Sequence, residues 1–260
     1  GLNIMMSMKD DAKPVSFIED CAVELKDLAE YTNGLNMIFD KYNVKGTWYA
    51  HASVGCLHVR PVLNMKIRHD VDKMRNIANE TSALVKKFNG SYSGEHGDGI
   101  ARSEFNEVMF GKKMMKIFKI IKNSFDPFNI FNPRKIVDAP KLDSRDLFRY
   151  APSYNAQNIN TILDWSAWTG ASGGFQGAIE MCNNNGSCRK LDGGVMCPSF
   201  RVTKDEKDST RGRANSLRLA LSGQLGEDAL INEKMNDTMK LCVSCKACKR
   251  ECPTVLICQK

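Results

Sequence analysis

The sequence predicts an α+β fold in two units, residues 1–138 and 176–260, with a connector over residues 139–175. Two observations predict it. In the first unit, segments with helical periodicity flank a run rich in aromatic and β-branched residues, as expected for a small sheet covered by helices. In the second unit, cysteines gather beside two short segments of helical character near 209–222 and 227–241. The chain has 260 residues, 42% of them hydrophobic, which is enough for one ordinary core and part of another.

The N-terminal segment, residues 14–42, predicts a helix. Ser16 is followed three residues later by Glu19, which is the spacing of a capping box. Apolar residues then recur at roughly helical spacing as far as Ile38.

The run GTWYAHASVGCLHVRPV contains two short stretches that suit strands and meet near Val54–Gly55, so it predicts a β-hairpin. A helix is expected over residues 70–88, where Gly90 follows as a stop signal. One or two further helices are expected over residues 103–123, with a break near Gly111.

Charge and composition exclude several classes of protein. The formal net charge is +7, but lysine and arginine are spread along the chain, so no nucleic-acid partner is expected. No apolar run approaches the roughly 20 residues that span a bilayer, and the first residues do not form a secretory signal. We expect a cytoplasmic protein, with peripheral attachment at the inner membrane left open. Because the chain starts with glycine and ends just after a cysteine motif, we expect a fragment of a longer protein.

The strongest motif is CVSCKACKRECP, which places Cys242, Cys245, Cys248 and Cys252 in a C-x2-C-x2-C-x3-C-P arrangement. A tight loop with thiolates three residues apart can hold three corners of an iron–sulfur cubane, and the fourth cysteine serves a second cluster. Zinc is the main alternative, although zinc sites usually join two separate Cys-x2-Cys pairs. Ordinary buried thiols are the other alternative.

A partner motif lies upstream, in MCNNNGSCRKLDGGVMCPSF. Cys182 and Cys188 are six residues apart, with Asn185 where a middle cysteine would stand, and Cys197 precedes proline. The expected ligands of one cluster are Cys242, Cys245, Cys248 and Cys197. Those of the other are Cys182, Cys188 and Cys252. Its fourth ligand is not placed by the sequence. The position is open, is filled by a non-cysteine group, or is supplied by a residue outside this chain; Cys258 is a further candidate, but it fits an ordinary thiol at least as well.

The first unit contains all four histidines, His51, His58, His69 and His96. A turn at Val54–Gly55 would bring the first two together, and the SGEHGDG loop could deliver Glu95 to the same point. Two imidazoles and one carboxylate form a common open site for a divalent metal, beside which His96 could act as a base. The alternative is that these histidines are ordinary surface residues and SGEHGDG is only a turn.

These motifs resemble a known family. SGEHGDGIARSEF followed by IKNSFDPFNIFNPRKI is similar to the C-terminal cap domain of FAD-linked oxidases of the vanillyl-alcohol oxidase type, which include D-lactate, glycolate and D-2-hydroxyglutarate dehydrogenases. YAHASVGCLHVRP resembles the two-histidine hairpin of that family. The remainder resembles the 4Fe–4S ferredoxin domain of large fusion proteins. The resemblance implies a ferredoxin-like antiparallel-sheet cap domain followed by a small, mainly helical 4Fe–4S domain.

The resemblance also implies roles for particular residues. His51, His58 and Glu95 would hold a divalent metal, with zinc as the expected ion, that grips the substrate. His96 would take the hydroxyl proton while hydride passes to FAD, and Asn132 would approach the flavin ring.

The implied substrate is a small D-2-hydroxy acid, D-2-hydroxyglutarate or D-lactate. The implied partners are an N-terminal FAD-binding domain and an electron acceptor: a quinone, a cytochrome or a flavoprotein. Two other hypotheses stay open, a non-catalytic electron-transfer module that docks a flavoprotein and a zinc-ribbon nucleic-acid binder. The substrate's side chain, the metal's identity, the acceptor and the oligomeric state are left open.

Overall fold

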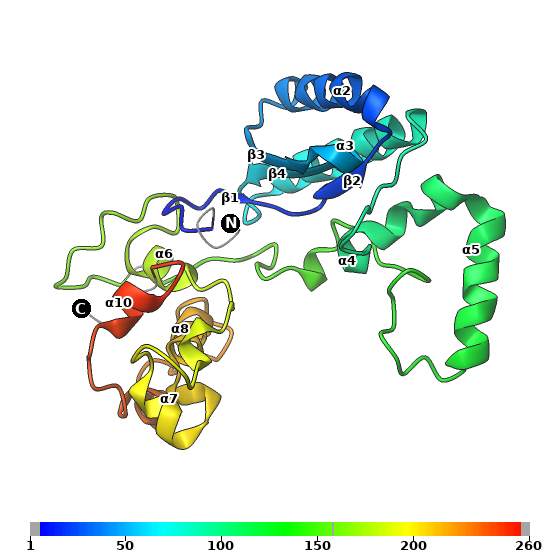
Figure 1. Cartoon of the computed structure of the whole chain (residues 1–260). Helices are drawn as coiled ribbons and strands as arrows, with labels where there is room; N and C mark the ends of the chain where they lie inside the picture. The colour runs from blue at the N-terminus through cyan, green and yellow to red at the C-terminus, as the bar shows by residue number, and fades with distance from the viewer. Residues whose placement is uncertain (1–5, 158, 256–260) are drawn as a thin grey trace. The chain divides into compact units, whose positions relative to one another are not determined.

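The structure is a computed structural model that describes residues 6–157 and 159–255 (Figure 1). The chain divides into two compact units. The first is Pro14–Pro152, and the second combines Ser153–Lys260 with Gly1–Lys13. Residues 139–152 therefore pack with the first unit, where Leu142 is part of the core.

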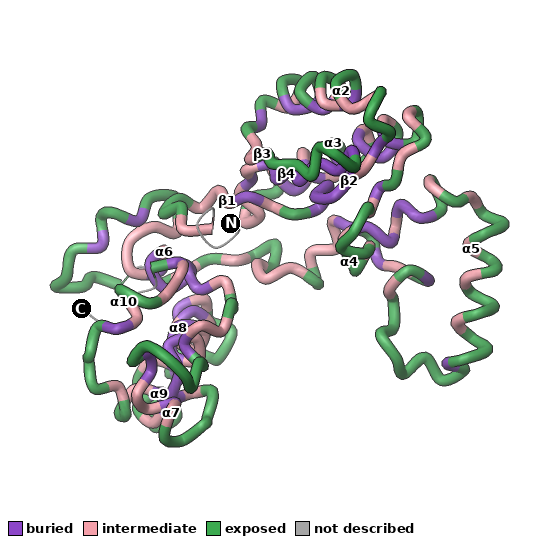
Figure 2. The backbone as a smooth tube through the Cα atoms, in the orientation of Figure 1, coloured by how far each residue is buried: buried purple, intermediate pink, exposed green. Residues whose placement is uncertain are grey.

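The first unit is built on a small sheet whose central strand is β4. The strands are β1 (Lys13–Pro14), β2 (Asp20–Ala22), β3 (Gly46–His51) and β4 (Cys56–Leu63). β2 and β3 both pair antiparallel with β4, and β1 also pairs with it. β4 is buried along almost its whole length because strands and helices cover it, and Figure 2 shows this as a continuous purple segment.

The β3–β4 hairpin predicted from the sequence is confirmed. A short 3-10 turn, η2 (Ala52–Val54), connects the strands, and Gly55 closes it with a positive φ of 69°. A Cβ atom at this glycine would lie 1.9 Å from the backbone oxygen of Val23, so no larger residue fits. The turn therefore fixes the register that pairs His51 with Cys56.

Two long helices pack on the sheet and supply most of the core. They are α2 (Leu28–Lys41) and α3 (Arg68–Lys87). The prediction of a helix over residues 70–88 is confirmed, with α3 beginning two residues earlier. Its buried side chains recur at helical spacing and meet Tyr31, Leu35 and Phe39 of α2 in one hydrophobic cluster.

The predicted capping box at Ser16 and Glu19 is wrong. Ser16 and Glu19 lie between β1 and β2, a short 3-10 helix, η1 (Leu25–Asp27), follows β2, and the helix begins only at Leu28. The side chains of Ser16 and Glu19 both contact Arg60 instead of the backbone of a helix. Tertiary partners that lie far away in the sequence thus override the local capping pattern.

The rest of the first unit is helical and irregular. It contains α4 (Gly99–Arg102), η3 (Ser103–Phe105), α5 (Asn106–Phe125) and η4 (Arg145–Leu147). The predicted break near Gly111 is confirmed, because this residue has non-helical backbone angles inside α5. Most of α5 is exposed, as Figure 2 shows in green and pink.

The second unit consists of short helices and turns. Its elements are α6 (Gly174–Glu180), η5 (Ser187–Arg189), α7 (Pro198–Thr203), η6 (Glu206–Asp208), α8 (Thr210–Leu221), α9 (Glu233–Met239) and α10 (Ala247–Glu251). The two predicted helices correspond to α8 and to the shorter α9. Trp165 and Trp168 pack with α6 and α8 in one core, and the cysteine-rich loops form another.

The fold is therefore a small antiparallel sheet with helices, followed by a mainly helical unit. The finer assignment of the first unit as ferredoxin-like stays a prediction. Within the described ranges, no helix combines the length and apolar character needed to cross a bilayer.

Candidate functional site

The hairpin brings two histidines to one face of the sheet. His51 pairs with Cys56, and His58 lies two residues further along β4, so all three side chains share a face. The loop that follows α3 adds Glu95: its Oε1 lies 2.7 Å from Nε2 of His58 and 3.7 Å from Nε2 of His51. One ligand atom from each of these three residues falls within 4.8 Å of the others. This is the group that the sequence predicted as a metal site.

The contacts of His58 suit a cation at this group. Nδ1 of His58 lies 3.2 Å from the Glu19 carboxylate, so the ring proton belongs on Nδ1. Nε2, which is buried and has no hydrogen-bond donor, then faces the Glu95 carboxylate with its lone pair. Two acceptors at 2.7 Å repel one another unless a cation or a proton lies between them. The donor set, two imidazoles and a carboxylate, suits a divalent metal.

The electrostatics keep Glu95 ionised. Burial acts to raise the pKa of Glu95, but the Cys56 thiol and the His58 ring outweigh it, so the pKa lies below its ordinary value. Glu95 is 40% exposed and His51 is 56% exposed, whereas His58 is buried. The group is therefore open on one side, which leaves positions for water or substrate.

Glu19 is a site residue that sequence reasoning missed. It is buried, its Oε1 accepts hydrogen bonds from His58 and Arg60, and its Oε2 accepts one from Nδ1 of His96. Glu19, His58 and His96 also come close enough to hold an ion. The Arg60 guanidinium beside Glu19 disfavours a second cation there, so this set is suited to hydrogen bonding.

Asp20, the neighbour of Glu19, anchors the loop that carries Glu95 and His96. One carboxylate oxygen of Asp20 accepts the backbone N–H of Glu95 at 2.9 Å and that of His96 at 2.6 Å. The other oxygen forms an ion pair with Arg102, and Asp20 has no exposed surface. The position of the loop, and with it two of the site's side chains, therefore depends on one buried carboxylate.

We expect Asp20→Ala to destabilise the first unit by about 3–5 kcal/mol, because it leaves the buried Arg102 without its partner. Thermal unfolding of the full-length protein should show a clear drop in the midpoint. Asp72→Ala is the matched control: it breaks only an exposed ion pair with Arg68 and should cost less than about 1 kcal/mol. Equal midpoints for the two variants would contradict the anchoring role of Asp20.

His96 and Asn132 line the same open pocket. The sequence resemblance had assigned them to substrate and to flavin, and the chain brings them to one cavity although they are far apart in sequence. Apolar side chains from α5 and the loop after it form much of its wall: Phe110, Phe118, Ile121 and Phe131. An apolar cavity with a few polar groups is the usual form of a cofactor or ligand pocket.

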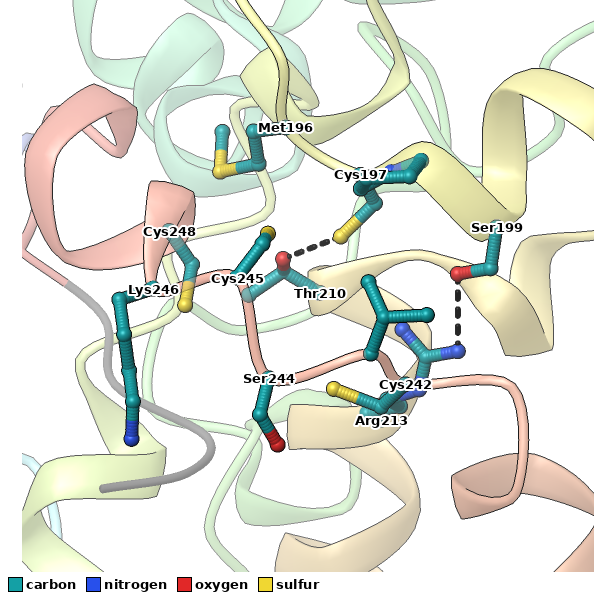
Figure 3. A pocket seen from close by; sticks show the side chains of 12 residues that line it. Met196, Cys197, Ser199, Thr210, Arg213, Cys242, Ser244, Cys245, Lys246 and Cys248 are labelled. Atoms are coloured by element: carbon teal, nitrogen blue, oxygen red, sulfur yellow. Dashed lines mark hydrogen bonds between the residues drawn. The ribbon is translucent and has the colours of Figure 1, made fainter.

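A second pocket, in the other unit, is lined by Cys197, Cys242, Cys245 and Cys248. Figure 3 shows that these cysteines come from two segments that are distant in sequence and surround one space. The hydroxyl of Thr210, at the start of α8, lies 2.7 Å from Sγ of Cys197. This is the four-cysteine set that the sequence predicted as the ligands of one cluster.

The pocket is also lined by a buried guanidinium, which lies 3.8 Å from the buried Asp208 carboxylate. Arg213 of α8 lines it, is almost fully buried, and is held by the backbone oxygen of Thr238 and the hydroxyl of Ser199. Burial raises the pKa of the Cys197 thiol, while Thr210 and the Arg213 charge oppose this effect. A guanidinium next to four thiols suits the net negative charge of a cysteine-ligated cluster.

The second predicted cysteine set is brought together more loosely. Cys252 packs against the core that contains Cys182 and also against the core that contains Cys188. One face of α8 presents polar groups to both sulfurs: the backbone N–H of Arg211 lies 3.4 Å from Cys188 Sγ, and Nδ2 of Asn215 lies 4.0 Å from Cys182 Sγ. These contacts support a common site, and the ligand set stays a prediction.

Asn185 occupies the place of a middle cysteine but serves the loop. Its Oδ1 accepts the backbone N–H of Ser187 at 2.9 Å, and its Nδ2 donates to Oδ1 of Asn183 at 2.5 Å. Both polar ends of the side chain are therefore used locally. Cys258, the candidate for the fourth ligand, lies outside the described residues.

The described thiols do not converge as tightly as the ligands of one zinc ion. With zinc–sulfur bonds of about 2.3 Å, ligands around one ion must lie within about 4 Å of each other. Among the described cysteines, no three bring their sulfurs within 4.8 Å, although four line one pocket. The nine cysteines in the described ranges are also free of disulfides.

The two cysteines of the first unit play a different part. Burial raises the pKa of Cys21 to about 12, and burial together with Glu95 raises that of Cys56 to about 11. Both side chains are buried, and neither is a member of the four-cysteine set. They belong to the core rather than to a ligand set.

Comparisons with known proteins agree with both units. The family described as FAD linked oxidases, C-terminal domain, matches residues 2–136, and the 4Fe–4S dicluster domain matches residues 178–256.

Curated relatives cover nearly the whole chain. The D-2-hydroxyglutarate dehydrogenase of Pantoea ananatis is 30% identical over 97% of this chain and 27% of its own length. That of Escherichia coli is 28% identical over 97% of the chain and 28% of its own length. The D-lactate dehydrogenase of Archaeoglobus fulgidus is 30% identical over 48% of the chain and 27% of its own length.

The present chain thus spans little more than a quarter of the length of its first relatives. The match to the oxidase domain extends over more than half of the chain and includes both histidines of the hairpin, the Glu95 loop and Asn132. The chain therefore belongs to the FAD-linked oxidase family, whose C-terminal domain it carries, followed by a 4Fe–4S dicluster domain.

Proposed function

We propose that this chain is part of an FAD-dependent dehydrogenase that oxidises a D-2-hydroxy acid to the 2-oxo acid and passes the electrons to iron–sulfur clusters. The observation that carries the proposal is the meeting of His51, His58 and Glu95 at one point, with the His96 ring 5.2 Å from the His58 ring. D-2-hydroxyglutarate is the proposed substrate, because relatives that cover 97% of the chain carry that name. D-Lactate is the next candidate.

Different residues of the chain would bind the cation and accept the proton. His51, His58 and Glu95 would hold a divalent cation, which would supply Lewis acidity to the hydroxyl and carboxylate of the substrate. His96 would accept the hydroxyl proton at Nε2, because its Nδ1 is occupied by Glu19. FAD, when bound, would supply the acceptor for the hydride from C2 of the substrate. A module that only docks a flavoprotein has no use for such a group, which favours the enzyme hypothesis.

The pocket shared by His96 and Asn132 is the proposed place for the flavin ring. Its apolar wall continues into side chains along α5 and the next loop that are half or more exposed: Phe110, Ile120, Ile121, Phe125, Phe128 and Phe131. Exposed apolar surface of this extent usually marks an interface. We propose that the flavin-binding part of the longer protein covers it.

Clusters bound by the two cysteine sets would carry the electrons away from the flavin. Cys197, Cys242, Cys245 and Cys248 would hold one [4Fe–4S] cluster, and Cys182, Cys188 and Cys252 would contribute to the other. Bound clusters would supply one-electron steps, whereas oxidation of a hydroxy acid releases two electrons at once. The final acceptor would be a quinone, a cytochrome or a flavoprotein.

Metal removal tests the proposal. In the full-length protein under anaerobic conditions, D-2-hydroxyglutarate is expected to bleach the flavin absorbance. Prior treatment with a chelator should slow this by about 100-fold or more, since Lewis-acid stabilisation is worth several kcal/mol. Added Zn²⁺, Mn²⁺ or Co²⁺ should restore the rate, while L-2-hydroxyglutarate should remain inactive. Equal rates before and after metal removal would refute the metal site.

A further inference from the structure

We propose that Glu19 is a positioning residue that fixes the tautomers of two histidines at once, so that His58 and His96 both present an unprotonated Nε2 to the substrate side. The inference rests on the proposed function of the site. It assigns a role to a residue that belongs to neither the metal ligands nor the base.

The geometry around Glu19 places a proton on Nδ1 of both histidines. Its Oε1 lies 3.2 Å from Nδ1 of His58, and its Oε2 accepts a hydrogen bond from Nδ1 of His96. An ionised carboxylate can only accept hydrogen bonds, so both Nδ1 atoms must carry the proton. A neutral imidazole has one ring proton, so in the neutral form of each histidine Nε2 presents a lone pair.

Arg60 keeps Glu19 in the ionised state. Its Nη2 donates to Oε1 of Glu19, and its Nε donates to Ser16 Oγ at 3.2 Å. The guanidinium also lies over the Tyr49 ring, at 5.1 Å from the ring centroid. Arg60 and Glu19 are both buried, so their charges compensate each other in a poorly solvated place.

The two lone pairs then serve different steps. Nε2 of His58 faces Glu95 at 2.7 Å, where the cation is proposed to bind. The His96 side chain is 46% exposed, and it lines the pocket that also contains Asn132. A histidine whose Nδ1 is held by a carboxylate is a better metal ligand and a better-oriented base. One buried carboxylate would thus prepare both the metal ligand and the base.

Glu19→Gln separates the two roles. The amide oxygen of glutamine should take the Oε1 position, where Arg60 and His58 both donate, and the NH₂ group should then face Nδ1 of His96. His96 would have to move its proton to Nε2 and could no longer accept one there. In the full-length enzyme we expect Co²⁺ affinity within about threefold of the wild type and flavin reduction slower by about 100- to 10,000-fold.

The measurements are a Co²⁺ titration of the metal-free protein, followed by visible absorbance, and anaerobic stopped-flow reduction of the flavin. The substrate dissociation constant should change little, because the metal still holds the substrate. A structural defect would instead lower Co²⁺ affinity, flavin content and rate together. The matched control is Glu104→Gln, which alters a carboxylate that pairs with Arg75 in the same unit and should change none of these values.

Because Glu19→Gln leaves Arg60 without its counter-charge, Glu19→Asp provides a second test in case the first variant does not fold. It keeps the charge but shortens the side chain by one carbon, so that it can reach only one histidine. Either Co²⁺ affinity or the rate should then fall about tenfold. A folded variant of either kind that matches the wild type in both values overturns the proposal. Two Co²⁺ ions per chain would also overturn it, because they would make Glu19 a metal ligand. Failure of the wild type to bind Co²⁺ would instead count against the proposed function.

Discussion

His96→Ala is expected to lower the rate of flavin reduction by D-2-hydroxyglutarate about 100- to 10,000-fold, the usual range for loss of a general base. His96 is the histidine whose ring reaches the pocket with Asn132 while its Nδ1 is held by Glu19. Cation affinity should stay close to the wild-type value, because His51, His58 and Glu95 are unchanged. Anaerobic stopped-flow absorbance at the flavin band measures the rate, and the cluster absorbance should remain intact.

The matched control for this variant is His69→Ala. His69 lies on the exposed side of α3, outside the group around Glu95, so its loss should leave the rate within about twofold. If His96→Ala reduced the flavin as fast as His69→Ala, the proton would have to leave by another route and His96 would lose its role. A fall in Co²⁺ affinity together with the rate would indicate a collapsed loop rather than a missing base.

Much of the site could be predicted because it depends on short-range patterns. The hairpin followed from two stretches of strand-forming residues and from Gly55, and its register then placed His51 and His58 on one face. The C-x2-C-x2-C loop likewise determines the spacing of three sulfurs by itself. Patterns of this kind need only neighbouring residues, so they can be read from a single sequence.

The supporting residues could not be predicted, because they act over long distances in the chain. Glu19 meets His58 across 39 residues and His96 across 77 residues. No residue next to Glu19 in the sequence indicates these partners, and the local capping pattern predicted a helix instead. The role of Asp20 could not be predicted for the same reason, since it anchors a loop 75 residues away. The only sequence signal is two adjacent carboxylates in an otherwise apolar segment, FIEDCAV, where burial would demand partners.

Cys245→Ala is expected to remove one cluster and about half of the iron while the substrate still reduces the flavin. Cys245 is exposed, so truncation of its side chain should disturb packing little, whereas Cys197 and Cys248 belong to a core. The rate of electron transfer to an external acceptor should fall much more than the rate of flavin reduction, because the variant lacks a cluster but keeps the substrate site. Iron and sulfide analysis after anaerobic purification, together with electron paramagnetic resonance of the reduced protein, measures the loss.

The control for this loop is Val243→Ala, a truncation of a side chain that is 68% exposed and has no ligand chemistry. It should keep the full iron content, which separates loss of a ligand from general damage to the loop. Wild-type iron in Cys245→Ala would mean that this thiol is not a ligand, and the shared pocket with Cys197 would need another explanation. A colourless wild-type protein that contains zinc would contradict the whole electron-transfer proposal. A site with a single zinc ion cannot transfer electrons, so oxidation of the hydroxy acid would have no path to an acceptor.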